Sequence, residues 1–237
     1  MIRAKCPFGE GEHIQSGYLL VAGISATDHF DRRERLRYHI STELKDRRVK
    51  LVFFLGLSSK SNINDKIQKE SEFHEDIIQG HFLDTYRNLT RKTILMVTWI
   101  NDYCNRSKFV LKMDDDMAIN STALRKSIET VVIPPKGVIS GNCRHQLQPI
   151  RNNASKWYVP VEDYPESHYP AACLGPGYLL SGNSVPLLYA EIHNVPFFVL
   201  EDIYLTGFVR QKAGVETNDI QRFFCCDRNL KCSLHHA

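Results

Sequence analysis

The sequence lacks the features that mark several large classes of protein. No apolar run approaches the roughly 18 residues needed to span a bilayer, and residues 1–17 are polar, without the apolar core of a signal peptide. Charge of one sign is not concentrated either. The 30 basic and 27 acidic residues leave a net charge of +3, with no basic stripe that would suit nucleic acid. We therefore expect a soluble chain as given, no nucleic-acid partner, and any membrane anchor outside this sequence.

Cysteine is present, but not in the spacings of a metal site. Seven cysteines are more than a typical cytosolic enzyme of this size has and too few for a disulfide scaffold. No two are spaced as Cys-x-x-Cys, which argues against a zinc ribbon or a thioredoxin-like site. Four triplets fit the glycosylation acceptor pattern and begin at Asn88, Asn105, Asn120 and Asn153. Together, the cysteines and these triplets favour a protein of the secretory pathway.

The order of the apolar runs predicts an α/β protein. Runs typical of buried strands occupy residues 18–24, 49–56, 76–78 and 109–113. Patterns typical of helices occupy residues 31–44, 63–73, 85–101 and 122–131. In the third of these helices one apolar face is expected to contain Tyr86, Leu89, Thr93, Met96, Val97 and Ile100. Strands that alternate with helices indicate a mostly parallel sheet flanked by helices.

The second half of the chain is richer in Pro, Tyr and Gly, and we expect it to be irregular. No flexible or charged linker separates it from the first half, so it should pack on that half rather than form a free domain. Gly175 and Gly177 flank a proline, which predicts a tight bend where a ligand can approach the backbone, although a structural turn explains it nearly as well. Glu201 and Asp202 begin an expected helix, where carboxylates also suit the helix dipole.

Three consecutive aspartates, Asp114 to Asp116, directly follow the expected strand at 109–113. Ligands of open α/β sheets bind at the carboxyl ends of strands. Carboxylates in such a turn can share one hard cation, and three adjacent charges at a buried strand end repel one another unless something neutralises them. The alternative is a solvated acidic turn, which is the commoner meaning of a bare Asp-x-Asp. A divalent cation carrying a diphosphate would account for the charges.

Taken together, these motifs resemble glycosyltransferase family 31, the β-1,3-galactosyltransferase and β-1,3-N-acetylglucosaminyltransferase group. The resemblance runs in order from Leu19 to His235. It rests on residues 32–37, 53–56, 76–93, 112–120, 156–159 with 164–165, 169–181 and 201–207. The sequence departs from the family at His39-Ile40, where a Thr-Trp pair is usual, and at Ala172 and Leu174.

The resemblance implies a GT-A type fold, with a Rossmann-like sheet and an irregular acceptor-side half. It implies a stem-like segment over residues 1–17 before a single catalytic domain over residues 18–237. The implied reaction is inverting, metal-dependent β-1,3-transfer of a hexose from a UDP-sugar to a glycan or glycoprotein hydroxyl, with galactose as the favoured hexose. The cation would be Mn²⁺, and the location the Golgi lumen behind a type II anchor. Alternatives are transfer of N-acetylglucosamine or N-acetylgalactosamine, or a catalytically silent sugar-binding relative.

The resemblance also assigns roles to residues. The general base would be Asp202, with Glu201 second, and the metal ligands Asp116, Asp114 and His235, with His236 as fallback. Donor-binding residues would be Arg33, Arg37, Asp76, Lys92, Asp114, Asp115, Gly175 and Gly177; for Lys92 a structural role is the alternative. Acceptor-binding residues would be Trp157, Tyr158 and Tyr169, although such aromatics are more often core. A disulfide between Cys104 and Cys173 is implied. Glycans are expected at Asn105 and Asn153, whereas Asn120 is placed to cap a helix.

Overall fold

Short buried strands form the centre of the structure, a computed structural model that describes residues 4–8, 18–46, 48–220 and 224–225. The strands of the main sheet are β1 Leu19–Ile24, β2 Val49–Leu57, β3 Ile77–Leu83, β4 Phe109–Asp114, β6 Val138–Arg144, β7 Ala172–Ser181 and β8 Glu216–Asp219. A separate pair consists of β5 Ala118–Ile119 and β9 Phe224–Cys225. The helices are α1 Phe30–Glu43, α2 Ser61–His74, α3 Leu89–Tyr103, α4 Ser121–Thr130, α5 Ser184–Glu191 and α6 Arg210–Ala213, with a 3₁₀ turn η1 Tyr86–Asn88 and a π-helix η2 Ile203–Val209.

The main sheet has the strand order β3-β2-β1-β4-β7-β6-β8. Strands β1 to β4 pair in parallel, β7 runs antiparallel to both β4 and β6, and β6 pairs in parallel with β8. Within the described residues, β7 is thus the one reversed strand of this sheet. The predicted α/β class and mostly parallel sheet are confirmed, because buried apolar runs suit strands that are covered on both faces.

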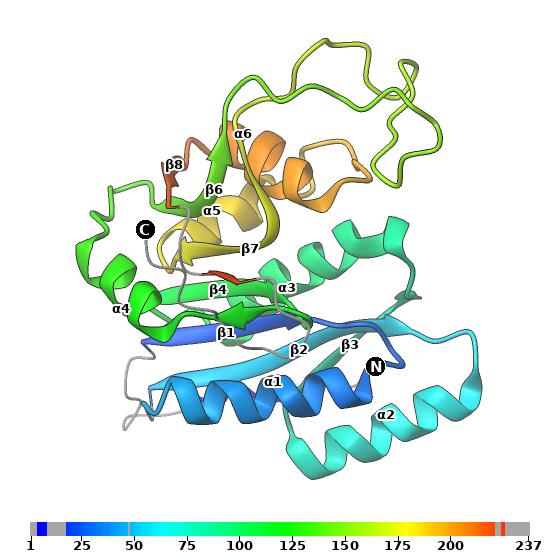
Figure 1. Cartoon of the computed structure of the whole chain (residues 1–237), viewed down its shortest axis with the longest axis vertical. Coiled ribbons are helices and arrows are strands. Elements are labelled where there is room, and N and C mark those ends of the chain that lie inside the picture. Colours follow the sequence, from blue (N-terminus) through cyan, green and yellow to red (C-terminus); the bar gives the residue numbers. More distant parts are fainter. Residues whose placement is uncertain (1–3, 9–17, 47, 221–223, 226–237) are drawn as a thin grey trace.

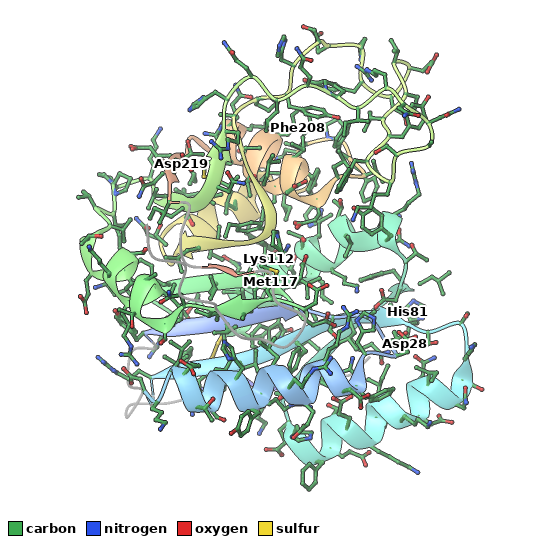
Figure 2. All side chains as sticks on the ribbon, in the orientation of Figure 1. Asp28, His81, Lys112, Met117, Phe208 and Asp219 are labelled. Atoms are coloured by element: carbon green, nitrogen blue, oxygen red, sulfur yellow. A yellow bond between two sulfur atoms is a disulfide. The ribbon has the colours of Figure 1, made fainter. Side chains whose placement is uncertain are left out.

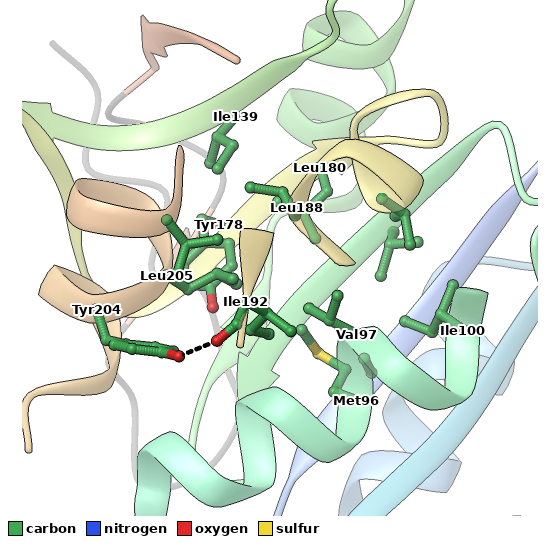
Figure 3. Packing of buried hydrophobic residues seen from close by; sticks show 14 of the residues in the cluster. Met96, Val97, Ile100, Ile139, Tyr178, Leu180, Leu188, Ile192, Tyr204 and Leu205 are labelled. Atoms are coloured by element: carbon green, nitrogen blue, oxygen red, sulfur yellow. Dashed lines mark hydrogen bonds between the residues drawn. The ribbon is translucent and has the colours of Figure 1, made fainter. Parts of the chain in front are cut away.

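Helices cover both faces of the sheet (Figure 1). Leu20 and Ala22 of β1 belong to the core shared with α3, α5 and η2, whereas Leu19 and Val21 belong to the core shared with α1, α2 and α4. Figure 3 shows the first core, where Met96 and the rest of the α3 face meet α5 and η2, and where the Tyr204 hydroxyl bonds the Ile192 carbonyl. The alternation along β1 therefore produces a three-layer arrangement.

The second half is more regular than predicted, since β6 and β7 lie inside it, and its longest described stretch without a helix or a strand of the sheet is residues 145–171. Glycine and proline within β7 hid the strand, because both normally interrupt one. The structure accommodates them as a bulge. Gly141 and Asn142 are consecutive in β6 but pair with Tyr178 and Leu174 of β7. Residues 175–177 therefore bulge out of the β6–β7 ladder, while Gly177 still pairs with Met113 of β4.

The predicted disulfide between Cys104 and Cys173 is wrong. Cys143 and Cys173 oppose each other in the β6–β7 ladder and are bonded, whereas Cys104 at the end of α3 is bonded to Cys6. The described residues 4–8 are therefore attached to the domain, and Ala4 also donates its backbone N–H to the Ile77 carbonyl. No described helix is long and apolar enough to cross a membrane.

The N-terminal ends of α4 and α3 test two of the sequence predictions. The side chain of Asn120 accepts a hydrogen bond from the Ala123 N–H (2.9 Å) and caps α4, as predicted. Tyr86 was expected on the apolar face of the helix at 85–101. That helix begins instead at Leu89, and Tyr86 lies in the preceding 3₁₀ turn with 47% of its surface exposed.

Candidate active site

A cavity of about 870 Å³ opens where β4 ends. Strand β1 has β2 on one side and β4 on the other, so the chain order reverses here, and open α/β sheets bind ligands at such a switch point. Figure 2 labels Lys112 within β4 and Met117 just beyond it. We call this the carboxylate cavity, and its lining consists of Arg32, Arg35, Tyr86, Leu89, Asp114, Asp115, Asp116, Met117, Lys156, Trp157, Gly175, Pro176, Val199, Leu200, Glu201 and Asp202.

The three aspartates differ in what surrounds them. Asp115 is buried and accepts hydrogen bonds from Ser25 Oγ (2.7 Å), and its carboxylate lies 2.8 Å from His29 Nδ1. Asp116 is half-exposed and lies 3.2 Å from Arg32 Nη1. Asp114 pairs with Lys112 Nζ at 3.1 Å. All three aspartates line the cavity, and the middle one also anchors the turn to the residues that follow β1.

A buried lysine connects the aspartate turn to the second acidic pair. Lys112 Nζ lies 2.6 Å from Glu201 Oε1, and Glu201 Oε2 accepts hydrogen bonds from Thr93 (3.0 Å) and Tyr178 (3.2 Å). Burial alone would lower the pKa of Lys112, but Asp114 and Glu201 outweigh it and raise it. Both oxygens of Glu201 are thus occupied inside the protein.

Asp202 follows Glu201 and faces the carboxylate cavity. Its Oδ1 accepts a hydrogen bond from Ile203 N (2.9 Å), and its Oδ2 accepts one from Gly175 N (3.3 Å). Gly175 has a φ of +94°, which favours glycine. Burial and the charge of Glu201 raise the pKa of Asp202, against the effect of the two backbone N–H groups. Burial, together with the charges of Glu201 and Asp116, likewise raises the pKa of Asp114 to about 6.

Several predicted donor-binding side chains do not line the cavity. Arg33 is fully buried and lies 2.6 Å from Glu70, and Arg37 pairs with Asp76 at 2.7 Å. Lys92 is also buried; it donates to the Ser25 carbonyl (2.6 Å) and pairs with Asp84 at 2.8 Å. Their contact with a donor stays a prediction, and the structure gives each of them partners within the protein.

Sequence reasoning missed two arginines, Arg32 and Arg35, that do line the cavity. The signal was present in the helical spacing. Arg32 and Arg35 are three apart on α1 and therefore share one face of the helix. Arg33 and Arg37 are four apart and share the face that meets α2 and Asp76.

Of the three predicted acceptor residues, one lines the cavity and two do not. Trp157 lines the cavity and is 48% exposed, but Tyr158 is half-buried in a bridge with Ile150. Tyr169 lies among the aromatic rings of Tyr164, Phe198 and Phe208. Its hydroxyl is buried without a partner among the described residues, and burial raises its pKa to about 12. Gly177 pairs with Met113 and is not part of the lining.

The carboxylates fit a hard cation only in part. Asp114 and Asp116 each pair with a basic group through one oxygen, which leaves the other as a potential oxygen ligand of the kind that Mn²⁺ or Mg²⁺ accepts. Among the described residues, however, no three or more His, Cys, Asp or Glu converge as a metal site. The predicted third ligand His235, and its fallback His236, lie outside the described residues.

A carboxylate-lined cavity at the switch point of a parallel sheet defines the class: an α/β protein with a site for a ligand at its strand ends. The galactosyltransferase family model matches residues 31–221, and the chain belongs to that family, as the motifs indicated. Mouse β-1,3-galactosyltransferase 1 is 33% identical over 200 residues, 83% of this chain and 61% of that protein. Mouse β-1,3-galactosyltransferase 2 is 38% identical over 157 residues, 65% of this chain and 37% of that protein. The chain thus spans less than two thirds of the length of these relatives.

Two solved structures are also similar. One is 4-diphosphocytidyl-2C-methyl-D-erythritol synthase from Anaerococcus prevotii, at 14% identity and a TM-score of 0.47, covering 86% of this chain and 87% of that one. The other is the catalytic domain of Drosophila β1,4-galactosyltransferase 7 with xylobiose, at 12% identity and a TM-score of 0.41, covering 85% and 64%.

Proposed function

We propose that this chain is an inverting, metal-dependent β-1,3-glycosyltransferase that moves a hexose from a UDP-sugar to a glycan or glycoprotein hydroxyl, with galactose as the favoured hexose. The observation that supports it best is that one cavity brings Asp114 and Asp116 together with Asp202, from distant parts of a chain of the galactosyltransferase family. The GT-A type of the sheet, the stem-like character of residues 1–17 and a lumenal Golgi location belong to the same proposal. So do glycans at Asn105 and Asn153, which lie in exposed turns.

On the donor side, Asp116 and Asp114 would hold Mn²⁺, with His235 as a further candidate ligand. A bound divalent cation supplies positive charge that stabilises a departing diphosphate. Arg32 and Arg35 add guanidinium groups to the same wall of the cavity, where they can bind phosphate oxygens. Gly175 leaves the wall beside Asp202 without a side chain.

On the acceptor side, Asp202 would accept the proton of the attacking hydroxyl as its oxygen bonds to the anomeric carbon and the bond to UDP breaks. The raised pKa of its carboxyl suits a base, because a stronger base accepts the proton more readily. Glu201 has no oxygen to spare for that task. Its contacts with Lys112, Thr93 and Tyr178 support a positioning role instead.

The decisive experiment is a UDP-release assay with a panel of UDP-sugars and acceptor glycosides, with and without Mn²⁺. We expect turnover that needs the cation and is fastest with UDP-galactose. Asp202→Asn should abolish transfer and retain UDP binding, whereas Asp116→Ala should lose both. Faster turnover of UDP-N-acetylglucosamine or UDP-N-acetylgalactosamine would change the donor. No turnover with any donor and no cation-dependent UDP binding would leave only the silent sugar-binding alternative.

A further inference from the structure

Three side chains that line the carboxylate cavity lie close together. Tyr86 comes from the 3₁₀ turn before α3, and Lys156 and Trp157 come from the long connection between β6 and β7. The Lys156 ammonium lies 4.5 Å from the centre of the Trp157 ring and 5.7 Å from that of Tyr86. We call these three residues the aromatic platform.

The platform is held in place, yet its rings stay half open. A cation near two aromatic rings is attracted to the face of each, so Lys156 links the turn before α3 to the connection between β6 and β7. Even so, Tyr86 is 47% exposed and Trp157 is 48% exposed. Two large aromatic side chains held in this way beside a cavity offer a flat apolar surface on which a ring-shaped ligand can lie.

The position of the platform relative to the carboxylates indicates what would cover it. Tyr86, Lys156 and Trp157 line the same cavity as Gly175 and Asp202. Burial and then the charge of Asp202 raise the pKa of the Tyr86 hydroxyl, with a smaller effect from Asp114. Arg32, by contrast, contacts Asp115 and Asp116. The basic wall therefore lies beside the proposed donor side of the cavity, and the platform lies nearer the proposed base.

We propose that Tyr86 and Trp157, held by Lys156, form the acceptor platform, on which the apolar face of a pyranose ring lies while one of its hydroxyls reaches Asp202. This inference rests on the proposed function, because it assigns the acceptor to the same cavity. It adds Tyr86 and Lys156 to a site for which the sequence had indicated Trp157 alone among the three. The ligand class is a glycoside with a flat, C–H-bearing ring face.

Kinetics on whole-length protein test the assignment. Trp157→Ala and Tyr86→Ala should each raise the KM for the acceptor by about tenfold, as removal of a central aromatic anchor does. UDP binding should change less than this KM, because the platform lies outside the proposed donor contacts. Lys156→Met should raise the same KM, because it loosens both rings. Phe73→Ala removes an exposed aromatic ring of α2 that is not part of the lining, and is the matched control.

A fluorescence titration tests the platform even if no transfer is found. The sequence has two tryptophans, of which Trp99 is buried in the core. In a Trp99→Phe background, the methyl β-glycosides of galactose and N-acetylglucosamine should change the fluorescence of Trp157, and the change should disappear in Trp157→Phe. A response without turnover would keep the platform and reject the proposed transferase. No response to either glycoside, or aromatic variants that weaken UDP binding and spare the acceptor KM, would overturn the platform.

Discussion

At the scale of single residues, the site depends on carboxyl groups whose neighbours differ. Asp115 is taken up by Ser25 and His29, Glu201 is taken up by Lys112, and Asp202 keeps only backbone donors. Because a carboxylate that already has charged or side-chain donors is a weaker base, the geometry selects Asp202 for proton transfer. Carboxyl groups that line one cavity thus acquire separate roles.

The pH dependence of transfer follows from the raised pKa of Asp202. A base acts only when ionised, so kcat/KM for the acceptor should fall as the pH decreases through that pKa, at a pH above the ordinary pKa of an aspartate. The stability of the fold changes with pH in the opposite direction. It decreases as the pH rises and Asp202 ionises, because the ionised form is disfavoured in the folded protein. Asp202→Asn should therefore be more stable than the unchanged protein at neutral pH and equal to it at low pH. Rate profiles and denaturant titrations measure the two effects, and an acid limb at the ordinary value would contradict the assignment.

The Lys112–Glu201 pair should act through position rather than chemistry. Lys112→Met leaves Glu201 buried and unpaired and should cost about 3–5 kcal/mol of unfolding free energy. The double variant Lys112→Met/Glu201→Gln removes both charges and should recover much of that loss. Its kcat should still be about 10- to 100-fold lower, since Asp114 and Asp202 are no longer held together.

Lys108→Met, which changes an exposed lysine just before the same strand, is the control for the buried pair. Denaturant unfolding and steady-state kinetics provide both readouts. A double variant with normal kcat would show that the pair serves stability alone.

At the scale of elements, β7 contributes most to the shape of the site. It is the reversed strand between β4 and β6, and its bulge at residues 175–177 brings the Gly175 N–H to Asp202. Thr206 of η2 donates to the Asp202 carbonyl (2.6 Å) and accepts from the Cys173 N–H (2.8 Å). A π-helix is rare and often lies at functional sites. Here it is tied to the strand that carries the bulge.

The disulfide of β7 should stabilise that arrangement. Cys143 and Cys173 are separated by 30 residues, and replacing both with serine should cost about 3–4 kcal/mol of unfolding free energy by the loop-entropy relation. The melting temperature should fall by about 10 °C. Peptide mapping without reduction should recover Cys6–Cys104 and Cys143–Cys173. Recovery of a Cys104–Cys173 peptide would contradict the structure.

At the scale of the whole molecule, the cavity is assembled from nearly the full length of the described chain. Its lining extends from Arg32 on α1 to Asp202 before η2, and the two cores on opposite faces of the sheet meet it at the end of β4. A ligand that bridges these parts binds only the folded protein. Binding should therefore be visible as global stability.

UDP with Mn²⁺, each at about 100 times its dissociation constant, should raise the free energy of unfolding by about 2.7 kcal/mol. For a protein of this size the melting temperature should rise by about 5–10 °C. UDP alone should give a smaller shift, and a chelator should remove the difference. In thermal melts Asp116→Ala should show no cation-dependent shift, whereas Phe73→Ala should behave as the unchanged protein. An equal shift with and without the cation would contradict a metal at the aspartate turn.

The sequence by itself determined the α/β class, the positions of β1, β2 and β4, and the family; the strand predicted at 76–78 extends in the structure over Ile77–Leu83. Each depends on local patterns: buried apolar runs, helical periodicity, and an acidic turn directly after β4. The same patterns hid β7, because Gly175, Pro176 and Gly177 weaken the signal of a strand. They also placed Tyr86 in a helix core, whereas the helix starts three residues later.

Only the tertiary structure decided which members of each motif reach the site. Asp115 is buried in the cavity wall because Ser25 and His29 contact it, and Arg33 is kept out of the cavity because Glu70 faces it from α2. Cys173 meets Cys143 rather than Cys104 for the same kind of reason. These outcomes depend on contacts between residues far apart in the chain. Spacing along one segment shows which side chains share a face, but not what that face meets.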